Sequence, residues 1–382
     1  MDKNVFKVID KIKKNGFSAY MVGGCVRDIL LGKIPDDYDI TTSAKPYEIQ
    51  KIFPKTIPTG IKHGTVTVLY YNKKYEVTTF RSDGEYINNR KPQSVVFTDN
   101  LKEDIKRRDF TINAIAFDKD SGYIDYFGGQ DDIKNKLVKA VLNPYERFTE
   151  DALRILRGIR FSSALSFKIE ENTFLAMKEK SHLLLNIAGE RIFDELNKMF
   201  SINPYKSVKL LYEIGFFSKF NLKIKDKNID YLANLNIKNF PLTIAEIFDL
   251  ESAFIFLNHL KCSNEVKKNT FNLIKSTSYS IDCKEELKIM LSDLNCENVF
   301  KEILELRSSQ GVDCCKVKKL YRQIVENNEC YSLKTLDING NDLINLGYKG
   351  NEIKTILNKA LKMVIKYPSL NKKEIIKEKL QF

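Results

Sequence analysis

The chain has 382 residues, 43% hydrophobic and 29% charged, which excludes a disordered protein and predicts two to four domains of roughly 150 residues each. No window approaches the roughly 18 uninterrupted apolar residues of a membrane span, and the charged N-terminus lacks a signal-peptide core, so we expect a soluble, cytoplasmic protein with no membrane partner. Lys and Arg number 62 against 50 Asp and Glu, and the net charge of +12 weakly favours a polyanionic partner such as a nucleic acid.

Short strand-like segments occupy the chain from about residue 17 to 140. Residues 65–71 and 75–80 alternate at period two on either side of a short polar stretch, which predicts an antiparallel hairpin. Other strands are expected at residues 20–22, 113–117 and 123–126.

Beyond about residue 146 the strand signals stop and helical periodicity begins. Apolar residues at three- and four-residue spacing predict helices over residues 151–161, 190–200, 207–214, 287–294, 317–325 and 352–365. The expected fold class is therefore α+β, with a head that contains a small mixed β-sheet followed by a long all-helical portion.

Cysteine and histidine chemistry is not indicated. The seven cysteines form no C-x-x-C pair, and we interpret them as reduced thiols that mostly fill the core. The three histidines are far apart and have no zinc-binding spacing.

A glycine pair, Gly23-Gly24, follows the first predicted strand and opens a helix. Paired glycines let a backbone approach a ligand closely, and helix N-termini present unpaired N–H groups to phosphate. Arg27 would add a forked cation suited to a triphosphate. The alternative interpretation is an ordinary strand-to-helix turn, and the pattern is not that of a P-loop.

Carboxylates gather in the next segment, Asp36-Asp37-Tyr38-Asp39-Ile40. If Asp37 and Asp39 lie on a strand, their spacing puts both side chains on one face, with Tyr38 and Ile40 on the other. Two such carboxylates repel each other unless cations neutralise them, and hard oxygen ligands favour Mg²⁺. A solvated acidic turn is the alternative.

The predicted hairpin supplies a third carboxylate, Glu76, in the middle of its second strand. An acidic residue at such a position is unusual on a buried sheet. Together with Asp37 and Asp39 it fits phosphoryl transfer assisted by two metal ions, one for the attacking hydroxyl and one for the leaving pyrophosphate.

Five segments in chain order resemble the motifs of class II tRNA nucleotidyltransferases (CCA-adding enzymes) and the related bacterial poly(A) polymerases. The first is the glycine turn with Asp37-Tyr38-Asp39. The others are Arg107-Arg108-Asp109-Phe110-Thr111-Ile112-Asn113-Ala114, Asp125-Tyr126-Phe127-Gly128-Gly129, Glu150-Asp151-Ala152-Leu153-Arg154-Ile155-Leu156-Arg157 and Gly189-Glu190-Arg191-Ile192-Phe193-Asp194-Glu195-Leu196. They extend over roughly half the chain.

The resemblance implies four domains and a single active site between the first two. These are a catalytic nucleotidyltransferase head (1–142), a helical neck that recognises the nucleotide base (143–203), a helical body (204–275) and a helical tail that binds tRNA (276–382).

The resemblance also implies roles for individual residues. Asp37 and Asp39 would hold Mg²⁺, and Glu76 falls where the family also has an acidic residue. Gly23, Gly24 and Arg27 would meet the nucleotide, and Arg108 and Asp109 would contact its phosphates or ribose. The stretch Arg81-Ser82-Asp83-Gly84-Glu85-Tyr86 with Arg90 resembles the family's loop for the final A, and it looks complete.

Asp151 and Arg154 suggest how a base is selected. On one helix, residues three apart lie within about 60° of each other, so these two side chains would present an acceptor and a forked donor to one base. Cytosine and adenine match this pair, whereas uracil and guanine reverse the pattern and leave buried polar groups unpaired. Arg157 would contact phosphate, and Arg160 would reach either nucleotide or a surface carboxylate; a solvated or interdomain salt bridge is the alternative for both. We interpret Glu190, Arg191 and Glu195 as structural.

The sequence thus predicts template-independent addition of C, C and A to tRNA 3′ ends from CTP and ATP, with Mg²⁺ as cofactor and pyrophosphate as product. No protein partner is expected. Two alternatives remain open: a poly(A) polymerase, A-adding or CC-adding enzyme on the same scaffold, and a non-catalytic RNA-binding protein.

Overall fold

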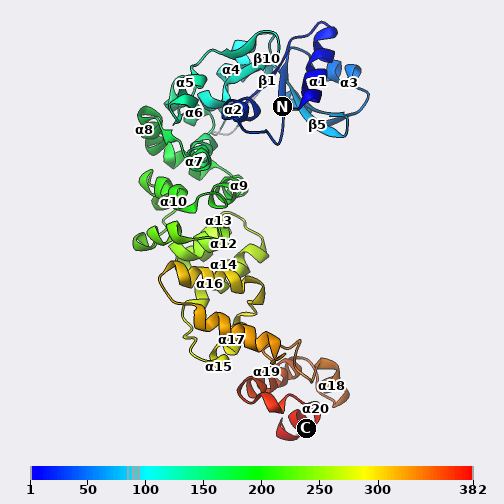
Figure 1. Ribbon diagram of the computed structural model, residues 1–382, viewed down its shortest axis with the longest axis vertical. Coiled ribbons are helices and arrows are strands. Elements are labelled where there is room, and N and C mark those ends of the chain that lie inside the picture. The colour runs from blue at the N-terminus through cyan, green and yellow to red at the C-terminus, as the bar shows by residue number, and fades with distance from the viewer. Residues whose placement is uncertain (1, 84–85, 88–90, 93–94, 381–382) are drawn as a thin grey trace. The chain divides into compact units, whose positions relative to one another are not determined.

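The computed structural model describes residues 2–83, 86–87, 91–92 and 95–380 (Figure 1). The chain folds into two compact units, residues 1–222 and 223–382. None of the described helices is long and apolar enough to cross a membrane. The finer division into head, neck, body and tail remains a prediction.

A seven-stranded mixed sheet forms the centre of the head. Its order is β11-β10-β1-β2-β5-β4-β3, and all neighbours are antiparallel except β2 and β5, which run parallel. The strands are β1 Ala19–Val22, β2 Asp39–Thr42, β3 Thr56–Gly60, β4 Thr65–Tyr70, β5 Lys73–Thr79, β10 Ile115–Asp118 and β11 Gly122–Asp125. The expected α+β class with a mixed sheet is confirmed.

Short strand pairs lie outside this sheet. They are β6 Arg81–Asp83 with β9 Val95–Phe97, β7 Tyr86–Ile87 with β8 Lys91–Pro92, and β12 Leu137–Val138 with β13 Lys168–Ile169.

The predicted hairpin is confirmed as β4 and β5. Its turn consists of Tyr71 and Asn72, both with positive φ (46° and 58°), the conformation that tight antiparallel hairpins prefer. The second strand begins at Lys73, two residues earlier than expected.

The two faces of the sheet are covered differently. Helices α1 (Lys3–Lys14) and α3 (Pro46–Ile52) lie next to each other beside one face, and α1 buries Val5, Val8, Ile9 and Ile12 at helical spacing (Figure 1). On the other face, Leu101 and Ile105 of α4 (Leu101–Lys106) pack in one cluster with Val22 and Phe80.

Helices complete the first unit. They are α2 Gly24–Leu30, α5 Gly129–Lys134, α6 Pro144–Glu150, α7 Leu153–Leu165, α8 Glu171–Lys180, α9 Gly189–Phe200, α10 Pro204–Glu213 and α11 Phe216–Lys219. Helix α7 packs against both α9 and α10.

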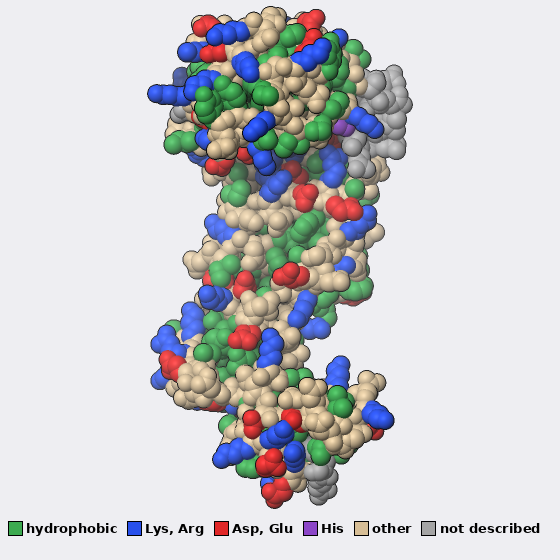
Figure 2. Space-filling model, turned by 90° about the vertical axis from the view of Figure 1, so that its right-hand side faces the viewer, with side chains coloured by type: hydrophobic (Ala, Val, Ile, Leu, Met, Phe, Trp, Pro, Cys, Tyr) green, Lys and Arg blue, Asp and Glu red, His purple; other side chains and the backbone are tan. Residues whose placement is uncertain are grey.

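The described part of the second unit contains helices and connecting segments, as the periodicity predicted. Its α-helices are α12 Phe240–Ile247, α13 Leu250–His259, α14 Asn264–Ser276, α15 Lys284–Leu294, α16 Phe300–Ser309, α17 Cys315–Glu326, α18 Gly340–Asn345, α19 Asn351–Lys366 and α20 Lys373–Leu380. Basic and acidic side chains are interspersed on the face shown in Figure 2.

One carboxyl group, that of Glu246 on α12, is fully buried in the second unit. It accepts hydrogen bonds from Gln310 Nε2 (3.1 Å) and Ser309 Oγ (3.3 Å) at the end of α16. Burial raises the pKa of Glu246 from 4.5 to about 7, although Gln310, Ser309 and Lys225 act in the opposite direction.

We therefore expect the stability of the protein to fall as pH rises from about 4.5 to about 7. In this range the unfolded chain loses the Glu246 proton while the folded chain keeps it, a difference of roughly 3 kcal/mol at most. Calorimetry at pH 5 and 7.5 should show a smaller pH dependence for Glu246→Gln than for wild type. The exposed Glu251→Gln is the control, and an unchanged slope in Glu246→Gln would contradict the prediction.

Candidate active site

A row of side chains crosses four neighbouring strands of the head sheet. Asp39 on β2 is paired with Glu76 on β5, Glu76 with Thr67 on β4, and Thr67 with Ile57 on β3. Because residues directly opposite each other point to the same face, all four side chains lie on one side of the sheet.

Asp37 joins this row from outside the sheet. The expectation that it lies on a strand with Asp39 is wrong, because β2 begins only at Asp39 and Asp37 lies in the preceding bend. Even so, Asp37, Asp39 and Glu76 line the same cavity of about 430 Å³. Tyr38 and Ile40 are buried, as expected.

The clustering of negative charge is visible in the pKa of Asp39. Burial is the largest contribution and raises this pKa. The charges of Glu76 and Asp37 raise it further, and the charge of Arg108 lowers it. A cation would relieve this repulsion, and carboxylate oxygens are the ligands that hard divalent ions prefer. Within the described residues, no group of three or more His, Cys, Asp or Glu side chains has the arrangement of a complete metal site.

The glycine turn lies directly beside these carboxylates. Gly23 has φ +84°, and a Cβ on it would lie 3.1 Å from Arg108 Nη1 and 3.6 Å from Asp39 Oδ2. The turn, Arg108 and Asp39 therefore meet at one place. Gly24 begins α2, as predicted.

Arg108 is held in this place by partial burial. Its Nη2 lies 3.7 Å from Asp104 Oδ2, and its Nε is a buried donor with no hydrogen-bond partner in the described structure. Burial lowers the pKa of Arg108, while Asp104 and Asp39 raise it. An anion bound over the Gly23 turn would place negative charge beside the Arg108 guanidinium.

Arg27 and Asp109 are joined through one amide. Arg27 donates to Asn113 Oδ1 (2.8 Å) and to Asp28 (2.8 and 2.9 Å), and Asn113 Nδ2 lies 3.3 Å from Asp109 Oδ1. Asp109 Oδ2 accepts from Arg157 Nε (2.8 Å). Burial raises the pKa of Asp109, but the charge and hydrogen bond of Arg157, the charge of Arg154 and the Phe110 N–H together keep it low.

Three of the arginines predicted to bind nucleotide lie close to the aromatic ring of Phe161. The guanidinium carbons of Arg160, Arg27 and Arg157 lie 4.4, 5.4 and 5.5 Å from its ring centroid. Glu195 on α9, which is buried, accepts from Arg160 Nε (2.6 Å) and lies 3.9 Å from Arg157. Both arginines thus form ion pairs. That of Arg157 with Asp109 joins the predicted head and neck, whereas that of Arg160 with Glu195 lies within the predicted neck.

The helical arrangement predicted for Asp151 and Arg154 is wrong. Helix α7 begins at Leu153, and Asp151 has extended backbone angles (φ −138°, ψ 101°) between α6 and α7. Its carboxylate accepts from Leu153 N (3.1 Å) and lies 3.6 Å from Arg191 Nη2 on α9. Because Asp151 lies outside α7, it does not share the 100° helical spacing of Arg154.

Arg154 is buried and bonded to protein groups. Its guanidinium donates to Glu150 (2.6 Å) and to the carbonyls of Arg147 (3.1 Å) and Arg107 (3.0 Å). Contact with a base would require it to exchange one of these bonds.

Five of the predicted residues nevertheless belong to one electrostatic chain within the first unit. Pairwise attractions link Asp39 to Arg108, Arg108 to Asp109, Asp109 to Arg157, and Arg157 to Asp151. Of the loop predicted for the final A, Gly84, Glu85 and Arg90 lie outside the described residues.

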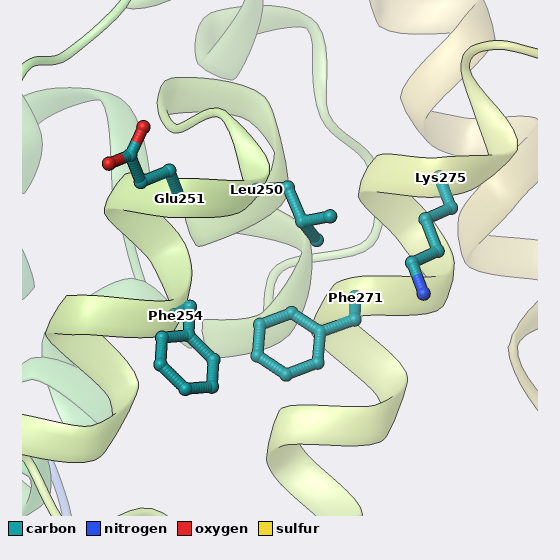
Figure 3. A pocket seen from close by; sticks show the side chains of 5 residues that line it. All are labelled: Leu250, Glu251, Phe254, Phe271 and Lys275. Atoms are coloured by element: carbon teal, nitrogen blue, oxygen red, sulfur yellow. The ribbon is translucent and has the colours of Figure 1, made fainter.

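A second cavity, of about 500 Å³, lies between α13 and α14 in the other unit (Figure 3). Its side chains are Leu250, Glu251, Phe254, Phe271 and Lys275, and the two phenylalanine rings are stacked with centroids 6.2 Å apart. This mainly apolar lining offers no cluster of acids, so the carboxylate cavity of the head is the candidate active site.

A carboxylate row that opens beside a cation and a glycine turn, on a small mixed sheet, is the arrangement of a nucleotidyltransferase. Family models agree: "Poly A polymerase head domain" matches residues 19–139, "Probable RNA and SrmB- binding site of polymerase A" matches 166–226, and domain 2 of tRNA nucleotidyltransferases matches 242–380.

Similar proteins indicate which nucleotidyltransferases this chain resembles. A CCA-adding enzyme of Staphylococcus haemolyticus is 38% identical over 97% of this chain and 95% of its own, and one of Ligilactobacillus salivarius is 39% identical over 98% and 95%. The crystal structure of the Bacillus stearothermophilus CCA-adding enzyme in complex with CTP is 30% identical, with a TM-score of 0.81, over 100% of this chain and 98% of its own. The chain belongs to the family of CCA-adding enzymes, which are tRNA nucleotidyltransferases.

We expect Gly23→Ala to weaken nucleotide binding strongly. The substitution strains the backbone and also crowds Arg108 Nη1, which lies 3.1 Å from the added Cβ and must shift, whereas Gly32→Ala, at φ +73° with no atom within 4 Å, adds strain alone. Steady-state kinetics should show at least a tenfold higher KM for CTP in Gly23→Ala than in Gly32→Ala. Equal KM values in the two variants would contradict the role given to Arg108.

Proposed function

We propose that the protein adds C, C and A in turn to tRNA 3′ ends, using CTP and ATP and releasing pyrophosphate. The observation that carries this proposal is the placement of Asp37, Asp39 and Glu76 in one cavity beside the Gly23 turn and Arg108. The relatives that match nearly the whole chain are CCA-adding enzymes, and one of them was crystallised with CTP.

The reaction is an in-line displacement at the α-phosphorus. The tRNA 3′-hydroxyl oxygen forms a bond to this phosphorus, the bond to the bridging oxygen breaks, and pyrophosphate leaves with that oxygen. Glu76, which extends the carboxylate row away from the Gly23 turn, accepts the hydroxyl proton.

Asp37 and Asp39 would hold Mg²⁺, with Glu76 next to them. When bound, a divalent cation supplies charge neutralisation for the attacking hydroxyl and for the phosphates. The raised pKa of Asp39 supports this assignment, because like-charged neighbours contribute to it.

The triphosphate would lie over the Gly23–Gly24 turn. Arg108, whose Nη1 lies beside the turn, would contact it, and Arg27 would add a second cation. Asp109 has a different role: both of its oxygens already accept hydrogen bonds, so it positions Arg157 and, through Asn113, Arg27.

Base choice would be made by protein groups at the start of α7. The Asp151 carboxylate would accept from the amino group of cytosine or adenine, and Arg154 would donate to the ring nitrogen. The tRNA itself would be held through phosphate and shape by the basic helical units, in line with the net charge of +12. The cytoplasmic location stays a prediction.

We expect the wild-type enzyme with Mg²⁺ to extend tRNA lacking CCA by two residues with CTP alone and by three with CTP and ATP. Asp39→Asn should reduce the rate by roughly a hundredfold or more, because it removes a charge at the reacting centre. The adjacent exposed Asp36→Asn is the matched control. A run of A or a stop at CC would favour the alternative enzymes, and no incorporation by wild type would favour a non-catalytic RNA-binding protein.

Asp151→Ala and Arg154→Ala should relax base selection by at least tenfold, measured as incorporation of CTP and ATP against UTP and GTP. The reason is that neither variant retains the complete acceptor and donor pair. Asp194→Ala, an exposed position on α9, serves as the control. If both variants keep the wild-type preference, other residues read the base.

A further inference from the structure

The strand order gives the candidate active site two distinct sides. The Gly23 turn follows β1, and Asp39 begins the neighbouring strand β2. On the far side of β2 come β5, β4 and β3 in that order, which carry Glu76, Thr67 and Ile57 in register with Asp39. The carboxylates therefore lie between the glycine turn and the β3 edge of the sheet.

In-line displacement requires a site with two opposite sides, one for the attacking group and one for the leaving group. The attacking oxygen and the leaving pyrophosphate lie on opposite sides of the α-phosphorus. If the triphosphate lies over the Gly23 turn and Arg108, as the proposed function has it, the hydroxyl must approach from the side of β5, β4 and β3.

We propose that the cavity wall formed by Ile57, Thr59 and Lys74 binds the 3′-terminal nucleotide of the acceptor RNA. This inference rests on the proposed function, and it assigns a substrate subsite to residues outside the five motifs. The same cavity that holds Asp37, Asp39 and Glu76 contains all three of these side chains.

The wall offers groups that match a terminal ribose. Ile57 is 39% exposed and presents apolar surface on the face of the carboxylate row. Thr59 Oγ1 lies 2.9 Å from Thr67 Oγ1, and this hydroxyl pair can both donate to and accept from a ribose 2′-hydroxyl. The ribose whose 3′-oxygen attacks must lie next to the carboxylates, as these groups do.

Lys74 supplies the charge for the adjoining phosphate. It lies two residues before Glu76 on β5, so its side chain is on the same face, about 7 Å along the strand. Lys74 is exposed and forms no ion pair within the described structure. Among the described residues that line the cavity, it is the cationic side chain. A hydroxyl near Glu76 would thus place the 5′-phosphate of the same nucleotide towards Lys74.

The neighbouring lysine provides a matched control. Lys73 is on the opposite face of β5, where its ammonium group lies 3.1 Å from Asp2 Oδ2. The variants Lys74→Gln and Lys73→Gln therefore remove the same charge from adjacent positions of one strand, and only the first removes it from the cavity.

We expect Lys74→Gln to raise the KM for tRNA lacking CCA by roughly five- to tenfold and to leave the KM for CTP within about twofold of wild type. The increase should be the same whichever base ends the acceptor, and the salt dependence of RNA binding should lose about one unit of slope. Lys73→Gln should change neither KM.

A second variant tests the ribose contact. Wild-type enzyme should prefer an acceptor ending in a ribonucleotide over one ending in a 2′-deoxynucleotide, and Thr59→Val should reduce that preference by at least threefold. An unchanged acceptor KM in Lys74→Gln, or an equal rise in the KM for CTP, would overturn the subsite. Failure of wild-type enzyme to incorporate CTP would instead overturn the proposed function.

Discussion

The rest of the head depends on the strand register that holds two mutually repelling carboxylates, those of Asp39 and Glu76, side by side. Asp39 and Glu76 lie opposite each other only because β2 and β5 run parallel in one register. A slip of one residue would turn one of these side chains into the core on the opposite face. The buried Val77 and Tyr75, which flank Glu76, hold that register because they must face α1 and α3.

Two carboxylates of the first unit are each shared by two guanidiniums. Asp104 pairs with both Arg107 and Arg108, and Glu150 pairs with Arg147 as well as Arg154. A carboxylate shared by two guanidiniums neutralises only one of them, so the surplus suits a polyphosphate. The same ion pairs fix the guanidiniums before substrate arrives, which reduces the reorganisation that binding and reaction require.

Periodicity predicted the head hairpin and several helices, such as α15, α17 and α19, but it missed or misplaced two elements at the candidate site. Strand β3 was not predicted, because Pro58 and Gly60 interrupt its pattern and a register shift lies between Ile57 and Gly60. The helix expected from Asp151 begins two residues later, because the Asp151 side chain accepts from Leu153 N. In both cases a local feature, rather than the apolar spacing, determines where the element lies.

The candidate site shows which features cannot be predicted from the linear sequence, namely those that depend on the order of the strands. Alternation over the predicted strand 75–80 already assigns Glu76 and Thr78 to one face, but nothing local states that β5 lies between β2 and β4 or that it extends back to Lys74. The parallel pairing joins Asp39 to a residue 37 positions away, across a hairpin and an edge strand. Motifs therefore predicted the carboxylates and the nucleotide side, whereas Ile57 and Thr59 acquire meaning only from the strand order. In the proposed arrangement the strand order also separates the attacking side from the leaving side, so the edge that was not predicted would give the reaction its direction.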